Sequence, residues 1–274
     1  MKRILAVCLT VAMTLSLSSC FLLPDVVTMQ WQSFEVAPED LHKGTLVPVN
    51  TDNPYVAPAD NSHLAPISDV WKSHVPAVYH VSETAVYMES TALAALDSML
   101  ADFAKVTKKD NVIIQSAYLS PEELGDLPAD HLTGLGCQLK FVTLDEEGAT
   151  VTHNLSEDEA YNWFFENHHK YGFVIRYPAD KDEVTGVSEY ADYFRYVGAP
   201  HAEYMKENNL CLEEYIELLK GYTAMNTLSV YTNGQHYKLY FASVSESFTI
   251  EYPAFHSYTY SGVGKDGIVV ILRD

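Results

Sequence analysis

Two stretches of this 274-residue chain combine side chains that can bind a metal ion or move a proton. The first, DHLTGLGCQ, runs from residue 130 to 138 and contains His131. The second, TGVSEYADYFRYVG, runs from residue 185 to 198 and contains Glu189 and Asp192. Imidazole and carboxylate groups are common ligands of catalytic zinc, which takes three protein ligands and keeps one position open for water. The two stretches are therefore the candidate site of the chain.

Three short motifs lie in or beside this candidate site. Residues 172–178 read GFVIRYP, residues 194–198 read FRYVG, and residues 131–134 read HLTG. These motifs resemble the core of the zinc D-alanyl-D-alanine carboxypeptidases of the VanY type, over roughly residues 46–209. In that family one segment reads His-x-x-Gly-x-Ala-x-Asp, and the other ends in Glu-Pro-Trp-His-Phe-Arg-Tyr-Val-Gly. The frame is present here, but most of the reactive positions carry other residues, so the chain is identified as a degenerate member.

The resemblance implies metal ligands at His131, Gln138 and Tyr193, and a catalytic base at Tyr190. An amide brings no negative charge to zinc, and a phenol, with a reference pKa near 10, stays protonated at neutral pH. Tyr190 cannot serve as a carboxylate base, and the loss of a general base alone typically costs about 10²–10⁴-fold in rate. We therefore expect no intact catalytic residue, no bound metal and no cofactor.

A metal site shifted by one residue would allow the chain to be an active zinc enzyme. Glu189 and Asp192 keep the spacing of the family's base and third ligand, shifted by one residue. Asp192 would then bind zinc beside His131, and Glu189 would be the base. A one-residue slip on a strand turns side chains to the opposite face, so this alternative needs a bulge.

The family's substrate clamp is also changed. The family places Ser-Gly-Tyr-Arg-Ser at the end of a strand, where this chain has SAYLS at residues 116–120. Ser116 keeps its position, but the arginine that helps to hold the substrate's carboxylate falls on Leu119. Arginine binds a carboxylate through a charged bidentate fork, and leucine offers no donor.

The elements that must position these residues can be read from periodicity. Apolar residues at three- and four-residue steps from Leu93 to Val106 predict a helix capped by Ser90 or Thr91. Ser156 and Glu159 form a capping-box pattern that predicts a helix to about Lys170, closed by Gly172. Strands are predicted at 112–117, 136–144, 173–177 and 194–197, and helices at 200–208 and 212–220.

A β-rich region follows. Asn233-Gly234 between alternating runs predicts a hairpin of strands 228–232 and 236–241, and further strands are predicted at 247–252, 257–261 and 268–272. The expected fold is α+β: a small, mainly antiparallel sheet flanked by helices, with the D-Ala-D-Ala carboxypeptidase and Hedgehog-like core that the resemblance implies. We assign residues 44–209 to this core and 210–274 to a helix plus β-rich extension.

The N-terminus reads as an export signal. Lys2 and Arg3 precede an apolar run, and residues 17–20 (LSSC) resemble a bacterial lipobox, so residues 1–19 are a predicted signal peptide and Cys20 a predicted lipidation site. Residues 20–43 would be a tether. Loss of residues 1–19 changes the formal net charge from −20 to −22, because it removes two basic residues and no acidic ones. Such a surface repels nucleic acids.

The remaining titratable residues are expected to support the fold. Cys137 is predicted to be a core thiol, with a bridge to Cys211 as the less favoured alternative. Arg195 is predicted to form a buried ion pair. His153 and His201 are predicted to lie on the surface, and His168 and His169 to be structural.

The leading hypothesis is a non-catalytic, lipid-anchored surface protein outside the bacterial membrane. It would bind a peptidoglycan stem peptide or an envelope protein in a remnant cleft lined by His131, Gln138, Tyr190 and Tyr193. The alternatives are an active zinc carboxypeptidase with the shifted site, and a structural envelope lipoprotein with a closed cleft.

Overall fold

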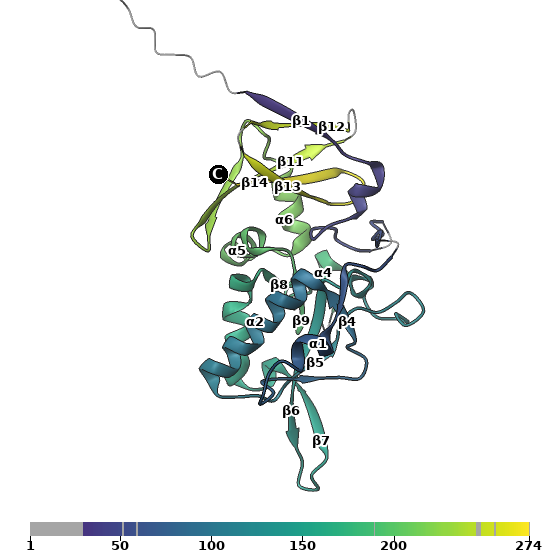
Figure 1. Cartoon of the computed structure of the whole chain (residues 1–274), viewed down its shortest axis with the longest axis vertical. Coiled ribbons are helices and arrows are strands. Elements are labelled where there is room, and N and C mark those ends of the chain that lie inside the picture. Colours follow the sequence, from purple (N-terminus) through teal and green to yellow (C-terminus); the bar gives the residue numbers. More distant parts are fainter. Residues whose placement is uncertain are drawn as a thin grey trace, which may run out of the picture. The chain divides into compact units, whose positions relative to one another are not determined.

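The computed structural model describes residues 30–50, 52–58, 60–188, 190–244, 248–254 and 256–273. Two units can be distinguished, Met1–Gln30 and Trp31–Asp274, and the second contains the whole fold described below (Figure 1). The predicted signal peptide, the lipidation site Cys20 and the fallback base Glu189 lie outside the described residues.

A six-stranded sheet organises the core. Its order is β3-β5-β6-β9-β8, and β7 pairs with β6. The strands are β3 (His80–Val81), β5 (Val112–Ser116), β6 (Gly136–Leu144), β7 (Thr150–Asn154), β8 (Phe173–Ile175) and β9 (Tyr193–Tyr196). All pairs are antiparallel except β3 with β5. The small, mainly antiparallel sheet predicted from the sequence is confirmed.

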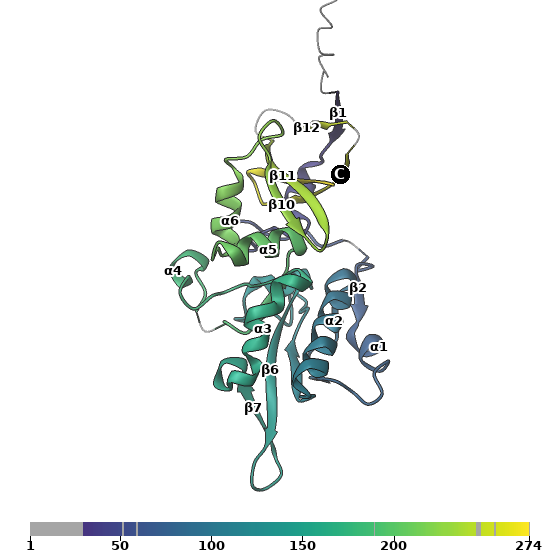
Figure 2. The same ribbon diagram turned by 90° about the vertical axis from the view of Figure 1, so that its left-hand side faces the viewer.

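Helices cover one face of this sheet. Cys137, Leu139 and Phe141 alternate along β6 and are buried in the same hydrophobic core as α2 (Ser90–Thr107) and α3 (Asn162–Asn167). The rings of Phe103 in α2 and Phe164 in α3 stack with centroids 4.4 Å apart, so the two helices lie side by side (Figure 2). Because side chains alternate along a strand, Gln138 points to the opposite face. That opposite face is where the candidate site lies.

The start and the apolar face of α2 differ from the prediction. Glu89 is the N-cap, and its Oε2 accepts a hydrogen bond from the Ala92 amide at 2.8 Å. Ser90 and Thr91, the predicted caps, already lie inside the helix. Val106 is 64 % exposed and does not belong to the buried face. A carboxylate at the N-terminus of a helix serves as a cap because it accepts free amide hydrogens and offsets the helix dipole.

The helix predicted from residue 156 to 170 is broken into short pieces. They are the 3₁₀ turns η3 (Leu155–Glu157) and η4 (Glu159–Tyr161), α3, and the 3₁₀ turn η5 (His168–Tyr171). The capping box joins Asn154 to Glu157, not Ser156 to Glu159. Asp158 has an extended backbone and caps the next turn by accepting from the Ala160 amide, which interrupts the helix. Gly172 closes the region with φ +82°, as predicted.

The β-rich extension is present. After α5 (Ala199–Glu207) and α6 (Leu212–Leu219), a four-stranded sheet has the order β10-β11-β14-β13. Its strands are β10 (Leu228–Thr232), β11 (Gln235–Ser243), β13 (Ser257–Gly262) and β14 (Gly267–Arg273). Asn233 and Gly234 both have positive φ, 51° and 73°, as the turn of a tight hairpin requires.

Part of the predicted tether is folded. Strand β1 (Trp31–Glu35) pairs antiparallel with β12 (Thr249–Pro253), and a 3₁₀ turn, η1 (Pro38–His42), follows. This strand was not predicted from local patterns, because its partner lies more than 200 residues away. Smaller elements complete the chain: β2 (Leu64–Pro66) paired with β4 (Tyr87–Glu89), α1 (Ile67–Trp71) and α4 (Asp182–Thr185).

Several buried residues bear on the predictions. Cys137 and Cys211 are both buried free thiols, so the bridge is not formed. His201 is only 1 % exposed and its Nδ1 lies 2.9 Å from the Tyr215 hydroxyl, so its assignment to the surface was wrong. An isolated histidine carries no pattern that distinguishes a buried from an exposed position. Among the described residues, no helix has the length and apolar character that a membrane crossing requires.

Candidate functional site

A short 3₁₀ turn, η2 (Ala129–Thr133), holds His131 beneath the open face of the sheet. The imidazole is fully buried. Its Nδ1 lies 3.0 Å from the Pro128 carbonyl oxygen, and its Nε2 lies 3.1 Å from Ser116 Oγ. Burial lowers the pKa of His131 below its ordinary value, so the ring is neutral at pH 7. Both ring nitrogens of the one histidine at a family ligand position therefore have protein partners.

Tyr193 fills the space beside this ring. Its position on β9 is the register partner of Gln138 on β6, and its ring centroid lies 4.6 Å from that of His131. Gly136 leaves room for the phenol, since a Cβ there would lie 2.5 Å from Tyr193 Cε1. Tyr193 is fully buried, and burial raises its pKa well above 10. The phenol is therefore neutral and cannot act as an anionic ligand.

Asp192, the metal ligand of the fallback arrangement, is bonded elsewhere. Asp192 Oδ2 lies 3.1 Å from Lys140 Nζ and accepts a hydrogen bond from the Leu155 amide at 3.2 Å. Tyr190 is half-buried, and its ring lies 6.3 Å from that of Tyr177 at 77°. Within the described part of the chain, no three His, Cys, Asp or Glu side chains come together as a metal site would require. An imidazole, an amide and a neutral phenol do not fit a catalytic zinc ion.

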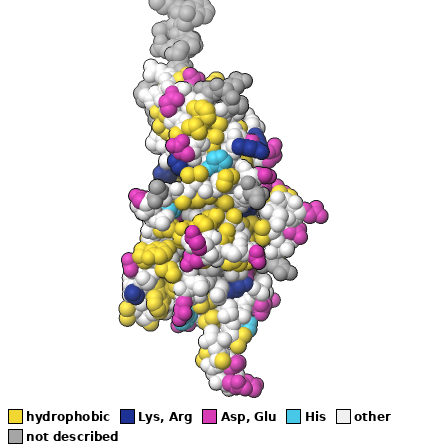
Figure 3. All heavy atoms as spheres, turned by 90° about the vertical axis from the view of Figure 1, so that its right-hand side faces the viewer, with side chains coloured by type: hydrophobic (Ala, Val, Ile, Leu, Met, Phe, Trp, Pro, Cys, Tyr) yellow, Lys and Arg dark blue, Asp and Glu magenta, His cyan; other side chains and the backbone are white. Residues whose placement is uncertain are grey.

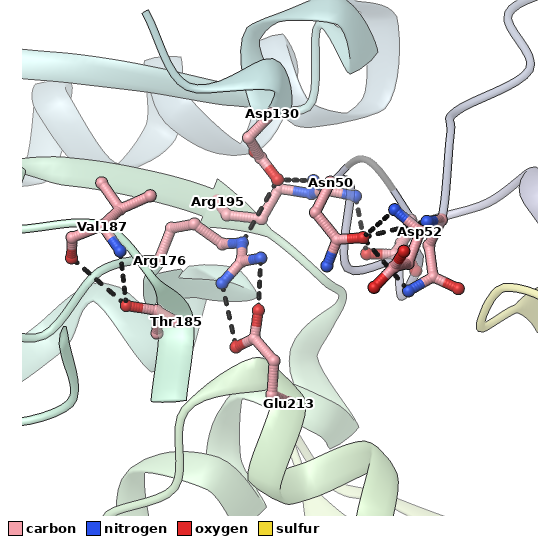
Figure 4. A network of polar contacts seen from close by, with 10 residues as sticks. Asn50, Asp52, Asp130, Arg176, Thr185, Val187, Arg195 and Glu213 are labelled. Carbon is pink, nitrogen blue, oxygen red and sulfur yellow. Dashed lines mark hydrogen bonds and ion pairs between the residues drawn. The ribbon is translucent and has the colours of Figure 1, made fainter. Parts of the chain in front are cut away.

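A buried charge network supports η2 from below (Figure 4). Asp130 Oδ1 accepts hydrogen bonds from Arg176 Nε, at 3.2 Å, and from Arg195 Nη1. Arg176 also binds Glu213 of α6 through two bonds of 3.0 and 2.6 Å. The buried ion pair predicted for Arg195 is confirmed. The sequence did not reveal Asp130, Arg176 or Glu213 as its partners, because none of them shares a local pattern with it.

A cleft of about 450 Å³ opens above these buried groups. Ser116, Leu119 and Gln138 line it, as the family positions predict. His131 and Tyr193 lie beneath its floor, and Tyr190 is outside its lining, so the predicted lining by these three residues was wrong. The other lining residues are Glu83, Thr84, Val86, Gln115, Glu123 and Leu127.

Among the described residues that line the cleft, Glu83 and Glu123 are carboxylates and none is basic. Ser120 donates its amide and hydroxyl hydrogens to Glu123, which lowers the pKa of that carboxyl and keeps it ionised. Acidic side chains are also more numerous than basic ones on the face drawn in Figure 3. The cleft therefore offers no charged partner for a ligand's carboxylate.

Comparison with known proteins identifies the frame. Residues 128–199 match the family model described as "VanY: D-alanyl-D-alanine carboxypeptidase". A D-alanyl-D-alanine carboxypeptidase of Enterococcus faecium is 30 % identical over 254 residues, which cover 87 % of this chain and 78 % of the relative. A second relative of that description, from Enterococcus faecalis strain V583, is 39 % identical over 92 residues, or 34 % of this chain and 31 % of its own.

One solved structure is similar over nearly the whole fold. The D,D-dipeptidase VanXYg, crystallised with a D-Ala-D-Ala phosphinate analogue, has a TM-score of 0.71 and 25 % identity, and the match covers 89 % of this chain and 100 % of that one. Residues 1–209 make up only about three quarters of this chain, so both long matches must extend into the β-rich extension. The resemblance is therefore broader than the range of 46–209 predicted from motifs.

Proposed function

This chain belongs to the D-alanyl-D-alanine carboxypeptidase family, and from that premise we propose that it is non-catalytic as a zinc peptidase and binds a cell-wall peptide in its cleft. The main support for this proposal is the contrast between the third metal-ligand position and the cleft. The position of the third metal ligand is filled by the buried, neutral Tyr193, while the cleft above it stays open to a ligand. The substitution at Tyr193 would thus remove hydrolysis and leave the cleft able to bind a peptide.

The ligand we propose is a peptidoglycan stem peptide ending in D-Ala-D-Ala. The similar VanXYg structure contains an analogue of this dipeptide, which supports the choice. Residues 1–19 would direct export, and after their removal Cys20 would hold the protein by a lipid outside the bacterial membrane, where such peptides are present. An envelope protein that presents a similar extended peptide is the other partner consistent with the cleft.

Metal analysis tests the loss of zinc chemistry. The purified protein is incubated with excess zinc, exchanged into metal-free buffer, and its bound zinc is measured. We expect far less than one zinc per chain, because the donor set does not suit the ion. The double variant Q138D/Y193H, which restores the family's ligand types beside His131, is the matched control and should bind more. Stoichiometric zinc in the unmodified protein, with release of D-alanine from a pentapeptide, would instead support the alternative with Asp192 and Glu189.

Peptide binding tests the cleft directly. Leu119 provides no hydrogen-bond donor, and the described lining residues include two carboxylates and no cation, so the C-terminal carboxamide of a D-Ala-D-Ala peptide should bind at least as tightly as the free carboxylate. The variant L119R introduces a charged fork and should favour the carboxylate by about tenfold, the scale of one charge-assisted hydrogen bond. Absence of binding by both peptides, measured by calorimetry, would favour the third hypothesis of a structural protein with a closed cleft.

A further inference from the structure

We propose that Ser116 is an activated nucleophile that accepts an acyl group from a ligand in the cleft. The inference rests on the proposed function only in that the same cleft admits the ligand. The observations that carry it are the Ser116–His131 hydrogen bond of 3.1 Å and the contact of His131 Nδ1 with the Pro128 carbonyl at 3.0 Å. A nucleophile bonded to a base that is itself oriented by a third group is the arrangement of nucleophilic enzymes.

The partners of His131 fix its tautomer. A carbonyl oxygen can only accept, so Nδ1 must carry the hydrogen that is donated to Pro128. With its hydrogen on Nδ1, the imidazole presents Nε2 as the acceptor for the hydrogen of Ser116 Oγ. His131 is therefore held in the form that can remove a proton from Ser116. In this role the Pro128 carbonyl takes the orienting place that a carboxylate has in a serine triad.

Local backbone geometry brings Ser116 to the cleft. The pairing of β5 with β6 shifts register between Ile114 and Ser116, which marks a bulge. A bulge turns the side chains beyond it relative to the regular alternation of the strand. Ser116 is half-buried and lines the cleft, whereas its base lies below the floor and is shielded from solvent. The nucleophile is thus accessible to a ligand, while its base lies behind it and out of contact with solvent.

Gln138 supplies a hydrogen-bond donor for the oxyanion that forms during acyl transfer. It is the register partner of Ser116 on β6 and lines the same cleft. Directly paired residues on an antiparallel sheet have Cβ atoms roughly 4.5–5.5 Å apart, so the two side chains start from neighbouring backbone positions and the amide is within reach of the hydroxyl. The family's aspartate at this position would repel a developing oxyanion, while the amide N–H of glutamine can donate to it. The same substitution that weakens a zinc site therefore suits acyl transfer.

The acyl transfer to Ser116 needs no group beyond these residues and the ligand. Ser116 Oγ attacks the acyl carbon of an ester or amide, and its proton moves to His131 Nε2. The carbonyl oxygen becomes an oxyanion next to the Gln138 amide. The bond to the leaving group then breaks, the leaving group takes the proton from His131 Nε2, and an ester on Ser116 remains. Since Glu83 and Glu123 line the cleft, we expect neutral or cationic acyl compounds to react faster than anionic ones.

A fluorophosphonate probe tests whether Ser116 is a reactive nucleophile, independently of peptide binding. The protein is incubated with excess probe, and the adduct is followed by intact mass and located by peptide mapping. We expect one adduct per chain on Ser116, no adduct in S116A, and unchanged labelling in S120A, whose hydroxyl is already bonded to Glu123. H131Q should label at least about 100-fold more slowly, the lower end of what a general base contributes.

If the variant H131Q does not fold, because His131 is buried, the variant Q138E provides a second test of the mechanism. It places a negative charge where the oxyanion forms, so it should also label at least about 100-fold more slowly, the scale of a lost oxyanion donor. No adduct on the folded protein, equal labelling of S116A, or equal rates in Q138E each overturn the inference. Peptide affinity is measured on the same samples. Retained peptide binding without labelling rejects the nucleophile alone, whereas loss of peptide binding with labelling intact rejects only the proposed function.

Discussion

Neutralising Asp130 should destabilise this protein strongly. Asp130, Arg176 and Arg195 are essentially fully buried, and Glu213 closes the group from α6. The two guanidinium groups and two carboxylates sum to zero charge. D130N keeps the size and one acceptor oxygen but leaves one positive charge uncompensated in the interior. Removing one partner of a buried ion pair costs about 3–5 kcal/mol, out of a total stability of roughly 5–15 kcal/mol.

The assay is urea unfolding followed by far-UV circular dichroism, with thermal melting alongside. For a domain of this size, a loss of about 3–5 kcal/mol lowers Tm by roughly 6–20 °C. E214Q is the matched control because Glu214 pairs with Lys181 near the surface, with side chains 28 % and 19 % exposed. A pair this close to solvent contributes about 0–1 kcal/mol, and glutamine keeps the oxygen that accepts the Cys211 amide hydrogen. A D130N loss no larger than that of E214Q, at an unchanged m-value, would refute the reasoning.

Three further predictions concern buried groups. The Tyr193 hydroxyl has no hydrogen-bond partner among the described residues, so Y193F should raise the free energy of unfolding by about 1 kcal/mol; a loss would show that the hydroxyl is bonded. G136A should cost about 1–3 kcal/mol by denaturant unfolding, because its Cβ would overlap the Tyr193 ring; an unchanged midpoint would contradict that packing. Burial lowers the pKa of His168 to about 4 and of His201 to about 3, so both are neutral when folded. Stability should therefore be complete above pH 6.5 and fall towards pH 4 by roughly 1 kcal/mol per pH unit for each, and H201Q should flatten this profile.

Sequence patterns correctly predicted the elements that are specified by residues close together in the chain. The apolar spacing from Leu93 to Phe103 identified α2, and Asn233-Gly234 identified the hairpin, because each is specified within a few residues. The exact caps were missed at Glu89 and Asn154, where a neighbouring side chain serves equally well as an acceptor.

The candidate site was predicted by position but not by contact. Motif spacing assigned Gln138 and Tyr193 to one site and Ser116 to the substrate cleft; in the structure Gln138 and Tyr193 are register partners and Ser116 lines the cleft. It could not show that His131 would bond to Ser116, since this contact depends on a bulge and on a 3₁₀ turn fifteen residues away. Nor could it show whether Tyr193 would enter the core or the cleft, because that depends on the missing Cβ of Gly136.

The pairing of β1 with β12 has a consequence for how the chain is made. Trp31 and Pro253 are register partners, so β1 leaves the ribosome about 220 residues before the strand that completes it. At about 5–20 residues per second this interval is roughly 10–45 s. During that time the backbone amides and carbonyls of residues 31–35 have no native partner, and an unpaired strand edge is open to pairing with other chains. Closing this sheet is thus among the last events of biogenesis, and a chain that begins after Glu35 would leave β12 permanently without its neighbour.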